Sequence, residues 1–506
     1  MRTPAVTPEY AIPLSCKYKL MNLIRLSLLI LITGLTLAKG NAQTKDNNAR
    51  PNIIFILTDD YANNLVDFMP NLKAMQQEGV TFSHYYVSNS LCCPSRSSIF
   101  TGKLPHNSGV QTNTKPSGGY EVYMDRGNAQ ESFCNALQEK GYKTAMMGKF
   151  LNGYLPGTHQ PLPGWSDWFV AGAGYRNFDY DINSNGRLLH YGHAPQDYLT
   201  DVLASRTDSL IKAWKDHPFF IEIATFTPHG PFIPAPRHEK LFASEKAPRT
   251  PAFNKQADST APDWLRQLKP LGAKKIDRID NIFRNRLRCI MSIDEMLGNI
   301  RKVLNETGLS NQTYIFFSSD NGYHLGDYSM LQGKQTPFDI DIRVPLIACG
   351  PKVAKGSLQQ AIVSNIDLAP TFAAIAGTKL TSTPDGRDIQ RLFLEQNTQK
   401  INWRKFAIIE HRRVDYDSND PDRQETEDGR LPSYTALRFR NMLYVEYETG
   451  EISCYDVRND PYELKNMATS LPEALKKKLH SIVEEVKNCG ARNGCWEVQL
   501  MDPGLD

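Results

Sequence analysis

The sequence has no hydrophobic run long enough to cross a bilayer, no zinc-type cysteine spacing and little excess charge of either sign. Its longest apolar run, Leu26 to Ala38, contains 13 residues, whereas a membrane-spanning helix needs about 20. None of its nine cysteines forms a CxxC pair, which argues against a structural zinc site. Internal repeats and low-complexity tracts are also missing, so a repeat architecture is not indicated. We therefore expect no stable membrane anchor.

The N-terminal residues are typical of an export signal. Met21 begins a short basic segment, the apolar run follows it, and Gly40-Asn41-Ala42 supplies small residues at a cleavage site. We predict that translation starts at Met21 and that cleavage follows Ala42. Residues 1–42 are then an N-terminal extension and signal peptide, and the mature protein is periplasmic or secreted.

The charge balance and the cysteines fit an exported protein. Residues 1–42 contain five basic groups and one acidic group, so the remaining chain has a net charge of −1 and no nucleic-acid partner is expected. In an oxidising compartment Cys489 and Cys495, which are separated by five residues, can form a local disulfide. The other cysteines of the mature chain, apart from Cys92, are predicted to be buried thiols.

Four apolar runs stop abruptly at polar residues. With 41% hydrophobic residues in a chain of 506, the sequence can bury a large core. Near-continuous apolar strands separated by helical stretches predict a mostly parallel sheet covered on both faces. In such sheets ligands bind beyond the carboxyl ends of the strands. The strands and the polar residues that follow them are 52–58 with Asp59 and Asp60, 144–147 with Lys149, 218–225 with His229, and 313–319 with Asp320 and Asn321.

The helical stretches and a change near residue 400 suggest the domain organisation. Helices are predicted over 132–140, 198–216 and 276–304, and residues 231–275 form a long surface excursion. Beyond residue 400, strands over 443–447 and 452–455 pair across a turn, and a helix follows over 472–486. We expect an α/β catalytic domain over 43–400 and a smaller α+β subdomain, an antiparallel sheet with a terminal helix, over 401–506.

The segment from Cys92 to Gly102 is the most informative in the chain. Its sequence, Cys-Cys-Pro-Ser-Arg-Ser-Ser-Ile-Phe-Thr-Gly, predicts a helix with Pro94 at its first position and Cys92 just before it. An anion at that place is favoured by the helix dipole, and Arg96 adds a full positive charge on the same side. A buried cysteine pair in front of a helix is the simpler interpretation of such a string.

The whole segment, however, resembles the C-x-P-S-R-x-x-x-x-T-G signature of type I sulfatases. In that family the signature cysteine is oxidised after translation to formylglycine. Only Cys92 has Pro at +2 and Arg at +4, so Cys92 rather than Cys93 is the modified position. The resemblance implies the mixed α/β fold that sulfatases share with alkaline phosphatase, and a formylglycine-generating or sulfatase-maturing enzyme as a partner.

The resemblance also assigns roles to the strand-end residues. It implies one Ca²⁺, held by Asp59, Asp60, Asp320, Asn321 and the formylglycine at position 92; hard oxygen donors of this kind suit calcium or magnesium. Around the nucleophile and the sulfate it implies four further residues. They are Arg96, Lys149, His229 and Lys334.

A departure from the common pattern points to one branch of the family. Many sulfatases have a His two residues after the strand-end lysine, whereas this chain has Leu151. Residues 148–152, 320–324 and 339–345 are similar instead to N-acetylglucosamine-6-sulfatases and extracellular heparan endosulfatases. This leaves His229 as the leading candidate for proton transfer and places His324 near the substrate. His411 and Arg412, in a charged stretch of the smaller domain, are candidates for binding an acidic sugar.

The implied reaction is hydrolysis of a sulfate ester on a glycan, such as the 6-sulfate of N-acetylglucosamine in heparan or keratan chains. A hydroxyl of the hydrated formylglycine attacks sulfur, and the second hydroxyl then drives the release of sulfate. Three alternatives remain open. They are a sulfatase of an algal polysaccharide such as ulvan, a phosphonate or phosphate monoester hydrolase of the same superfamily, and a non-catalytic glycan-binding relative if Cys92 is unmodified.

Overall fold

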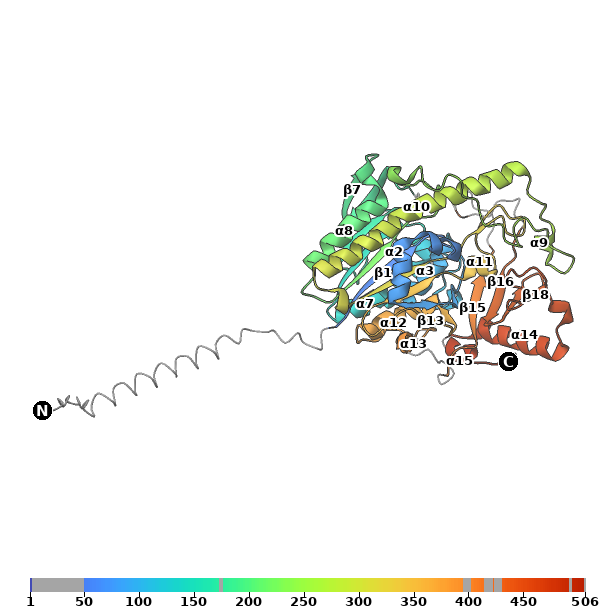
Figure 1. Ribbon diagram of the computed structural model, residues 1–506. Helices are drawn as coiled ribbons and strands as arrows, with labels where there is room; N and C mark the ends of the chain where they lie inside the picture. The colour runs from blue at the N-terminus through green and yellow to red at the C-terminus, as the bar shows by residue number, and fades with distance from the viewer. Residues whose placement is uncertain are drawn as a thin grey trace. The chain divides into compact units, whose positions relative to one another are not determined.

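A ten-stranded sheet forms the centre of the molecule (Figure 1). The computed structural model describes residues 1, 50–172, 176–394, 402–413, 422, 430–490 and 494–504. The predicted extension and signal peptide over 1–42 lie outside the described residues, Met1 excepted. Among the described residues, no helix has both the length and the apolar character needed to cross a membrane. Residues 50–506 form one compact unit.

The central strands of this sheet are parallel, as the apolar runs predict. β1 (Asn52–Thr58) lies between β8 (Phe219–Ala224) and β9 (Thr313–Ser319), and β4 (Lys143–Lys149) pairs with β8 on the other side. The remaining strands are β5 (Asp167–Ala171), β6 (Tyr180–Ser184) and β7 (Arg187–Tyr191) at one edge, and β12 (Leu346–Cys349), β2 (Val80–Phe82) and β13 (Ser357–Gln359) at the other. Antiparallel pairs occur toward both edges, so the sheet is mixed.

Helices cover both faces of the sheet because successive residues of a buried strand point to opposite sides. Ile54 and Ile56 of β1 belong to one core, whereas Phe55 and Leu57 belong to the other. The first core lies under α2 (Pro70–Glu78), α8 (Leu199–Ala213) and α10 (Ala273–Glu306), and the second under α3 (Cys92–Thr101), α7 (Phe133–Glu139) and α12 (Leu368–Ile375) (Figure 1). The predicted helices are therefore present, and α10 extends beyond its predicted range at both ends.

A second, four-stranded antiparallel sheet follows residue 401. Its strands are β15 (Phe406–His411), β16 (Tyr434–Phe439), β17 (Met442–Tyr447) and β18 (Ile452–Asp456), and α14 (Glu473–Asn488) and α15 (Cys495–Gln499) complete the region. One face of the sheet packs on α14, while the opposite face, with Ile409 and Val445, joins the α3 side of the main core. The predicted Cys489–Cys495 disulfide is present.

Short elements connect these layers. The excursion over 231–275 contains a 3₁₀ turn (Pro236–His238) and α9 (Asp263–Arg266), and α10 begins within its last three residues. The other short helices and strands are α4 (Pro105–Ser108), α5 (Gly119–Asp125), α6 (Asn128–Glu131), α11 (Asp339–Ile342), α13 (Gln390–Leu394), β3 (Tyr85–Tyr86), β10 (His324–Leu325), β11 (Gln332–Gly333) and β14 (Val363–Ser364).

The predicted start of α3 is wrong by two residues. The helix begins at Cys92, with Leu91 as its N-cap, so Pro94 occupies the third helical position. The amide of Ser95 makes the first intrahelical bond, to the carbonyl of Leu91. A proline is tolerated there because the first turn of a helix has no partners for its N–H groups. Cys92 nevertheless stays at the positive end of the helix dipole.

Candidate active site

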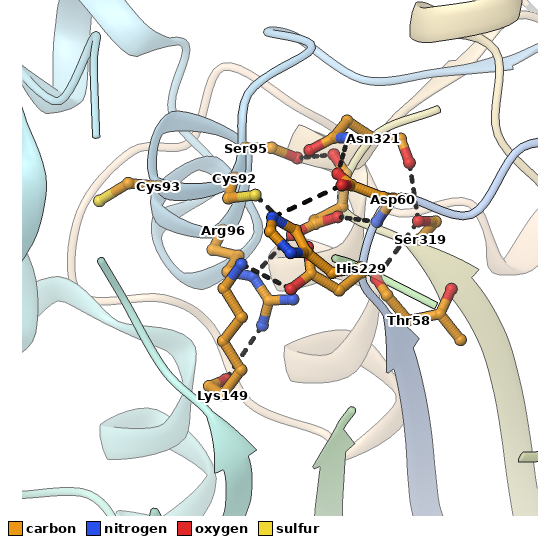
Figure 2. A network of polar contacts seen from close by, with 12 residues as sticks. Thr58, Asp60, Cys92, Cys93, Ser95, Arg96, Lys149, His229, Ser319 and Asn321 are labelled. Carbon is orange, nitrogen blue, oxygen red and sulfur yellow. Dashed lines mark hydrogen bonds and ion pairs between the residues drawn. The ribbon is translucent and has the colours of Figure 1, made fainter. Parts of the chain in front are cut away.

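Side chains from four strand ends and one helix meet at the carboxyl edge of the large sheet. Because β1, β4, β8 and β9 are parallel, the residues that end or follow them lie at the same edge. They are Asp59 and Asp60 after β1, Lys149 at the end of β4, His229 beyond β8, and Asp320 and Asn321 after β9, and α3 adds Cys92 and Arg96. Figure 2 labels Asp60, Cys92, Arg96, Lys149, His229 and Asn321. The structure thus brings together the metal, nucleophile and sulfate candidates of the sequence.

Cys92 lies inside this cluster and Cys93 does not. Figure 2 shows the Cys92 sulfur directed toward His229 and the Cys93 sulfur directed away from the cluster. The Cys92 Sγ is 2.8 Å from Lys334 Nζ and 3.4 Å from Asp59 Oδ1, whereas Cys93 belongs to the hydrophobic core. Burial, and then the charge of Asp320, raise the pKa of the Cys92 thiol well above its usual value. An unmodified Cys92 therefore stays protonated and is a poor nucleophile.

Arg96 ties three elements of the site together. It is fully buried, its Nε donates to Asp320 Oδ2 over 2.8 Å, and its Nη1 donates to the carbonyl of Lys149 over 3.0 Å. Burial opposes the charge of Asp320, but Arg96 and the neighbouring lysines outweigh it and lower the pKa of that carboxyl to about 2. A buried guanidinium paired in this way fixes the position of its carboxylate.

Two lysines neutralise the paired carboxylates after β1. Lys149 Nζ is 2.6 Å from Asp59 Oδ2, and Lys334 Nζ is 2.7 Å from Asp60 Oδ1. All four side chains are at least nine-tenths buried. Lys334 follows β11, which pairs with β10, so a small hairpin supplies it rather than the sheet itself.

The backbone of Asp60 is held in an uncommon conformation. Its φ is 60°, in the left-handed region, which Asp tolerates better than most residues. Arg286 of α10 donates from Nη2 to the Asp60 carbonyl and from Nη1, over 3.3 Å, to the Pro228 carbonyl. The Asp60 amide donates to Asp320 Oδ1 over 3.2 Å. These contacts turn the Asp60 carboxylate into the cluster.

The cluster has the composition of a cation site. Ligand atoms of Asp59, Asp60, Cys92 and His229 lie within 4.8 Å of one another, and all four residues are buried. The Asn321 Oδ1 is buried and accepts no hydrogen bond from the described residues, while its Nδ2 donates to Asp60 Oδ1 over 2.7 Å. A buried acceptor without a donor beside carboxylates fits a hard divalent cation, which prefers oxygen ligands.

His229 lies among the carboxylates of the cluster. Its Nδ1 faces the Gly230 carbonyl at 2.7 Å, and its Nε2 lies 2.7 Å from Asp422 Oδ1 and 3.5 Å from Asp60 Oδ2. Burial lowers its pKa, but the charges of Asp60, Asp59 and Asp422 outweigh burial and raise it above the usual value. These carboxylates therefore favour the protonated imidazole.

Asp422, like Arg286, belongs to the site although no sequence pattern predicts it. Its carboxylate accepts from Asn113 Nδ2 at 2.7 Å and lies 2.9 Å from Lys334 Nζ, in addition to His229. Burial opposes its ionisation, but Lys334 and His229 hold its pKa well below the usual range. Nothing in the sequence distinguishes this aspartate from the other acids of residues 415–428.

The three residues predicted to bind substrate lie in two different places. His324, on β10, is buried with its Nδ1 2.9 Å from Asp341 Oδ2. His411 ends β15 and stacks on Tyr434 with ring centroids 5.3 Å apart, and Arg412 follows it and donates to Gln111 Oε1 over 3.0 Å. His411 and Arg412 line a cavity of about 500 Å³ rather than the cluster around Cys92.

Known proteins that share this sequence pattern or this fold include sulfatases and related hydrolases. A sequence model of the family described as "Sulfatase" matches residues 51–378, and one described as "N-sulphoglucosamine sulphohydrolase, C-terminal" matches residues 326–489. The chain belongs to the sulfatase family, and it is a hydrolase of sulfate esters.

Two curated relatives and two solved structures illustrate the similarity. The human N-acetylglucosamine-6-sulfatase is 34% identical over 94% of this chain and 91% of its own length. The N-acetylglucosamine-6-O-sulfatase of Bacteroides thetaiotaomicron is 26% identical over 91% and 90%. BT4656, solved with its substrate D-glucosamine-2-N,6-O-disulfate, has a TM-score of 0.72 at 23% identity, over 87% of this chain and 98% of that one. The phosphonate monoester hydrolase of Agrobacterium radiobacter has a TM-score of 0.65 at 18% identity, over 90% and 97%, so the fold by itself does not separate sulfatases from that class.

Proposed function

We propose that this sulfatase removes the 6-O-sulfate from N-acetylglucosamine residues of a sulfated glycan, with formylglycine at position 92 and one Ca²⁺. The observation that carries the proposal is the burial of Cys92 at the start of α3, in contact with Lys334 and Asp59. The choice of sugar is supported by full-length similarity to N-acetylglucosamine-6-sulfatases of human and goat, at 34% and 33% identity.

Formylglycine at position 92 would supply a hydrated aldehyde whose hydroxyl group is a nucleophile toward sulfur. The surroundings favour such a group over the thiol, because the raised pKa of Cys92 leaves no thiolate to react. The Lys334 ammonium, 2.8 Å from the side chain of residue 92, stabilises negative charge on that side chain.

Asp59, Asp60, Asp320 and Asn321 would hold the calcium ion, which supplies positive charge beside the sulfate and the nucleophile. Asp59 approaches residue 92 most closely, through Oδ1. Arg96 and Arg286 hold Asp320 and the Asp60 backbone in place, so these ligands are positioned by the protein.

Around the sulfate, Lys149 and Lys334 supply buried positive charge, and His229 supplies the proton. A sugar alkoxide is a poor leaving group, and its departure is assisted by a proton donor near its oxygen. The His229 Nε2 faces Asp422 and Asp60 in the interior of the cluster, and these carboxylates favour its protonated form. We assign it the transfer of a proton to the leaving oxygen, and Lys334 the stabilisation of the group at position 92.

The proposal extends to maturation and location. A formylglycine-generating or sulfatase-maturing enzyme would modify Cys92 before folding encloses it, since the side chain is fully buried in the folded protein. We propose export by the N-terminal signal. The Drosophila melanogaster relative named extracellular sulfatase SULF-1 homolog, 33% identical over 72% of this chain and 34% of its own length, supports an extracellular setting.

A substrate panel tests the proposal directly. The purified enzyme is offered N-acetylglucosamine-6-sulfate, glucosamine N-sulfate, an ulvan oligosaccharide, an aryl sulfate and an aryl phosphonate, and the peptide containing residue 92 is analysed by mass spectrometry. We expect formylglycine and the highest kcat/KM on the 6-sulfate. Faster turnover of the ulvan oligosaccharide or the phosphonate would replace the proposed substrate, and an unmodified thiol in active enzyme would overturn the mechanism.

A further inference from the structure

Two adjoining cavities lie between the large sheet's α3–α6 region and the four-stranded sheet. The first has a volume of about 400 Å³ and the second about 500 Å³. His106, Gln111 and Arg412 line both of them, so the two cavities are neighbours, and together we call them the Arg412 cleft. None of its polar residues takes part in the mechanism described above.

The first cavity has an excess of positive charge. Lys103, His106, Arg126 and Arg412 line it, with Glu131 as the single acidic group among the described lining residues. Lys103 pairs with Glu131. Burial lowers the pKa of His106, but its contact with Glu410 outweighs burial and raises that pKa to about 9. Neither Arg126 nor Arg412 forms an ion pair with a described carboxylate, so two guanidinium groups are available to an anion.

The second cavity is lined by charged groups of both signs, among them Glu410, Glu446, Glu448, Arg413 and Lys487, and by uncharged groups that suit a sugar ring. Asn89 is 1% exposed, and neither its Oδ1 nor its Nδ2 has a hydrogen-bond partner among the described residues. Buried amides without partners are rare in folded proteins, and such a group at a cavity wall is free to bind a hydroxyl. Burial lowers the pKa of His411 to about 3, so its ring is neutral where it stacks on Tyr434.

The cleft begins next to the catalytic residues. Asn89 precedes Cys92 by three positions, and the Tyr434 hydroxyl donates to the carbonyl of Gln335, the residue after Lys334. Gln111 is two residues from Asn113. The Asn113 side chain accepts a hydrogen bond from the Cys93 amide and donates one to the Asp422 carboxylate. Gln335 also donates from Nε2 to the Asp422 carbonyl over 2.9 Å, so the wall of the cleft is bonded to residues of the catalytic cluster.

We propose that the Arg412 cleft binds an anionic group on a sugar next to the one that loses its sulfate. This inference rests on the proposed function, since it assigns the remainder of the same substrate. Arg126 and Arg412 would bind the anion, and Asn89 a hydroxyl of the same sugar. A uronic-acid carboxylate and a second sulfate are the two sources of such a charge in a sulfated glycan, and both accept paired hydrogen bonds from guanidinium.

The test compares substrates that differ only beyond the reacting sugar. They are N-acetylglucosamine-6-sulfate itself, a neutral N-acetyllactosamine carrying the same 6-sulfate, a uronate-containing heparan-type tetrasaccharide, and a keratan-type tetrasaccharide with sulfated galactose. For Arg126→Ala and Arg412→Ala we expect at least a tenfold loss of kcat/KM on an anionic oligosaccharide, through KM, because charge-assisted hydrogen bonds are lost. Activity on the first two substrates stays unchanged. The tetrasaccharide that shows the loss identifies the anion as carboxylate or sulfate.

Matched variants separate the cleft from general charge effects. Arg187→Ala removes an exposed arginine from the edge strand β7 and should change none of the four rates. Asn89→Ala should raise KM for both tetrasaccharides. Equal rates on all four substrates in wild type and Arg412→Glu, or a loss that includes the monosaccharide, would overturn the proposal.

Failure of the proposed function gives a different result. If the wild-type enzyme hydrolyses none of the 6-sulfated substrates, the choice of sugar is wrong, and the cleft is tested by calorimetric binding of the two tetrasaccharides. Weaker binding to Arg412→Glu than to wild type would then retain the cleft. Equal binding, or none to wild type, would reject it.

Discussion

The carboxyl edge of the ten-stranded sheet and the end of the four-stranded sheet use charge in opposite ways. At the large sheet, Arg96, Lys149 and Lys334 are nearly or fully buried and paired with the buried carboxylates of Asp320, Asp59 and Asp60 respectively. At the small sheet, Arg412 and Arg413 follow β15 on the exposed surface. Both regions face the same expected substrate. We therefore assign the reaction to the buried charges of the large sheet and substrate recognition to the exposed charges of the small sheet.

Burial explains the difference. A charge removed from water costs several kcal/mol unless it is paired, and it then acts strongly on its neighbours because little water screens it. Such charges suit a reacting sulfur centre. An exposed arginine has little desolvation cost and forms weaker ion pairs, which suits contacts that distinguish between substrates. We therefore expect changes at the large sheet to lower kcat on every substrate, and changes at the small sheet to raise KM on extended ones.

The largest expected effect is at Cys92, and its result decides whether the large sheet carries the reaction. Cys92→Ala and Cys92→Ser should lower turnover of every sulfate ester by at least about 10³-fold, because the nucleophile is lost. Thermal unfolding should shift little. Cys93→Ala, in the adjacent core position, is the control and should retain turnover. Substantial activity in purified Cys92→Ala would contradict the assignment.

Removing the metal should have the next largest effect. Dialysis against a calcium chelator should reduce turnover by about 10²-fold or more, since the ion's charge stabilises the reacting sulfate, and added Ca²⁺ should restore it. Asp59→Asn should need more Ca²⁺ for half-maximal activity. Asp385→Asn changes a buried acid outside the cluster, and its calcium dependence should match that of wild type. Full turnover in excess chelator would contradict the predicted site.

His229→Gln tests which residue of the large sheet donates the proton to the leaving group. Loss of a proton donor should lower kcat by about 10²-fold on a sugar sulfate. The loss should be much smaller on an aryl sulfate, because a phenolate leaves without a proton. Steady-state rates on both substrates provide the measurement. Lys149→Ala is the companion variant and should slow both equally; an equal loss in His229→Gln would assign proton transfer elsewhere.

Glu410→Gln should alter stability and leave the chemistry intact. The pKa of His106 is raised to about 9 by Glu410, and the two side chains are 17% and 15% exposed. The stabilisation is thus complete below the unfolded-state pKa of about 6.5, and it is lost as the pH rises to about 9; its upper limit is about 3 kcal/mol. Urea unfolding should show a weaker variant at pH 6 and equal stability at pH 9.5. Glu473→Gln, in an exposed pair, should show no such pH dependence.

The smallest effect is expected at Asp422. Its carboxylate stands among Lys334, His229 and Asn113, which are donors that suit a sulfate group. Asp422→Asn removes a repulsion of about 1 kcal/mol or more, so inhibition by inorganic sulfate should strengthen by about fivefold. Glu139→Gln, at the exposed end of α7, is the control. Weaker inhibition in Asp422→Asn would show that the carboxylate instead orients the donors.

The central strands and their strand-end residues could be predicted from the sequence because both depend on local patterns. The runs over 52–58 and 313–319 coincide with β1 and β9, since an apolar strand buried on both faces is near-continuous and ends where polar residues begin. The start of α3 was predicted two residues too late, because proline fits any of the first helical positions, whose N–H groups lack partners in the helix.

Other parts of the site depend on contacts between distant segments. Arg286 lies within the long amphipathic helix α10, where an arginine usually faces solvent, yet it reaches the backbone on two strand ends. Asp422 and the pairing of His106 with Glu410 likewise join segments far apart in sequence. The Arg412 cleft arises only when the two sheets pack, so no single motif marks it.

The two backbone contacts of Arg286 have a consequence for how the site is assembled. The Arg286 guanidinium donates hydrogen bonds to the carbonyls of both Asp60 and Pro228. It therefore links the turn that carries the Asp60 carboxylate to the turn that carries the His229 imidazole. The distance between these two turns is thus fixed by α10, which carries Arg286, without a bound ion or sugar. A conservative exchange of that arginine for lysine, which has no fork, would let the two turns drift apart while every reacting side chain remained present.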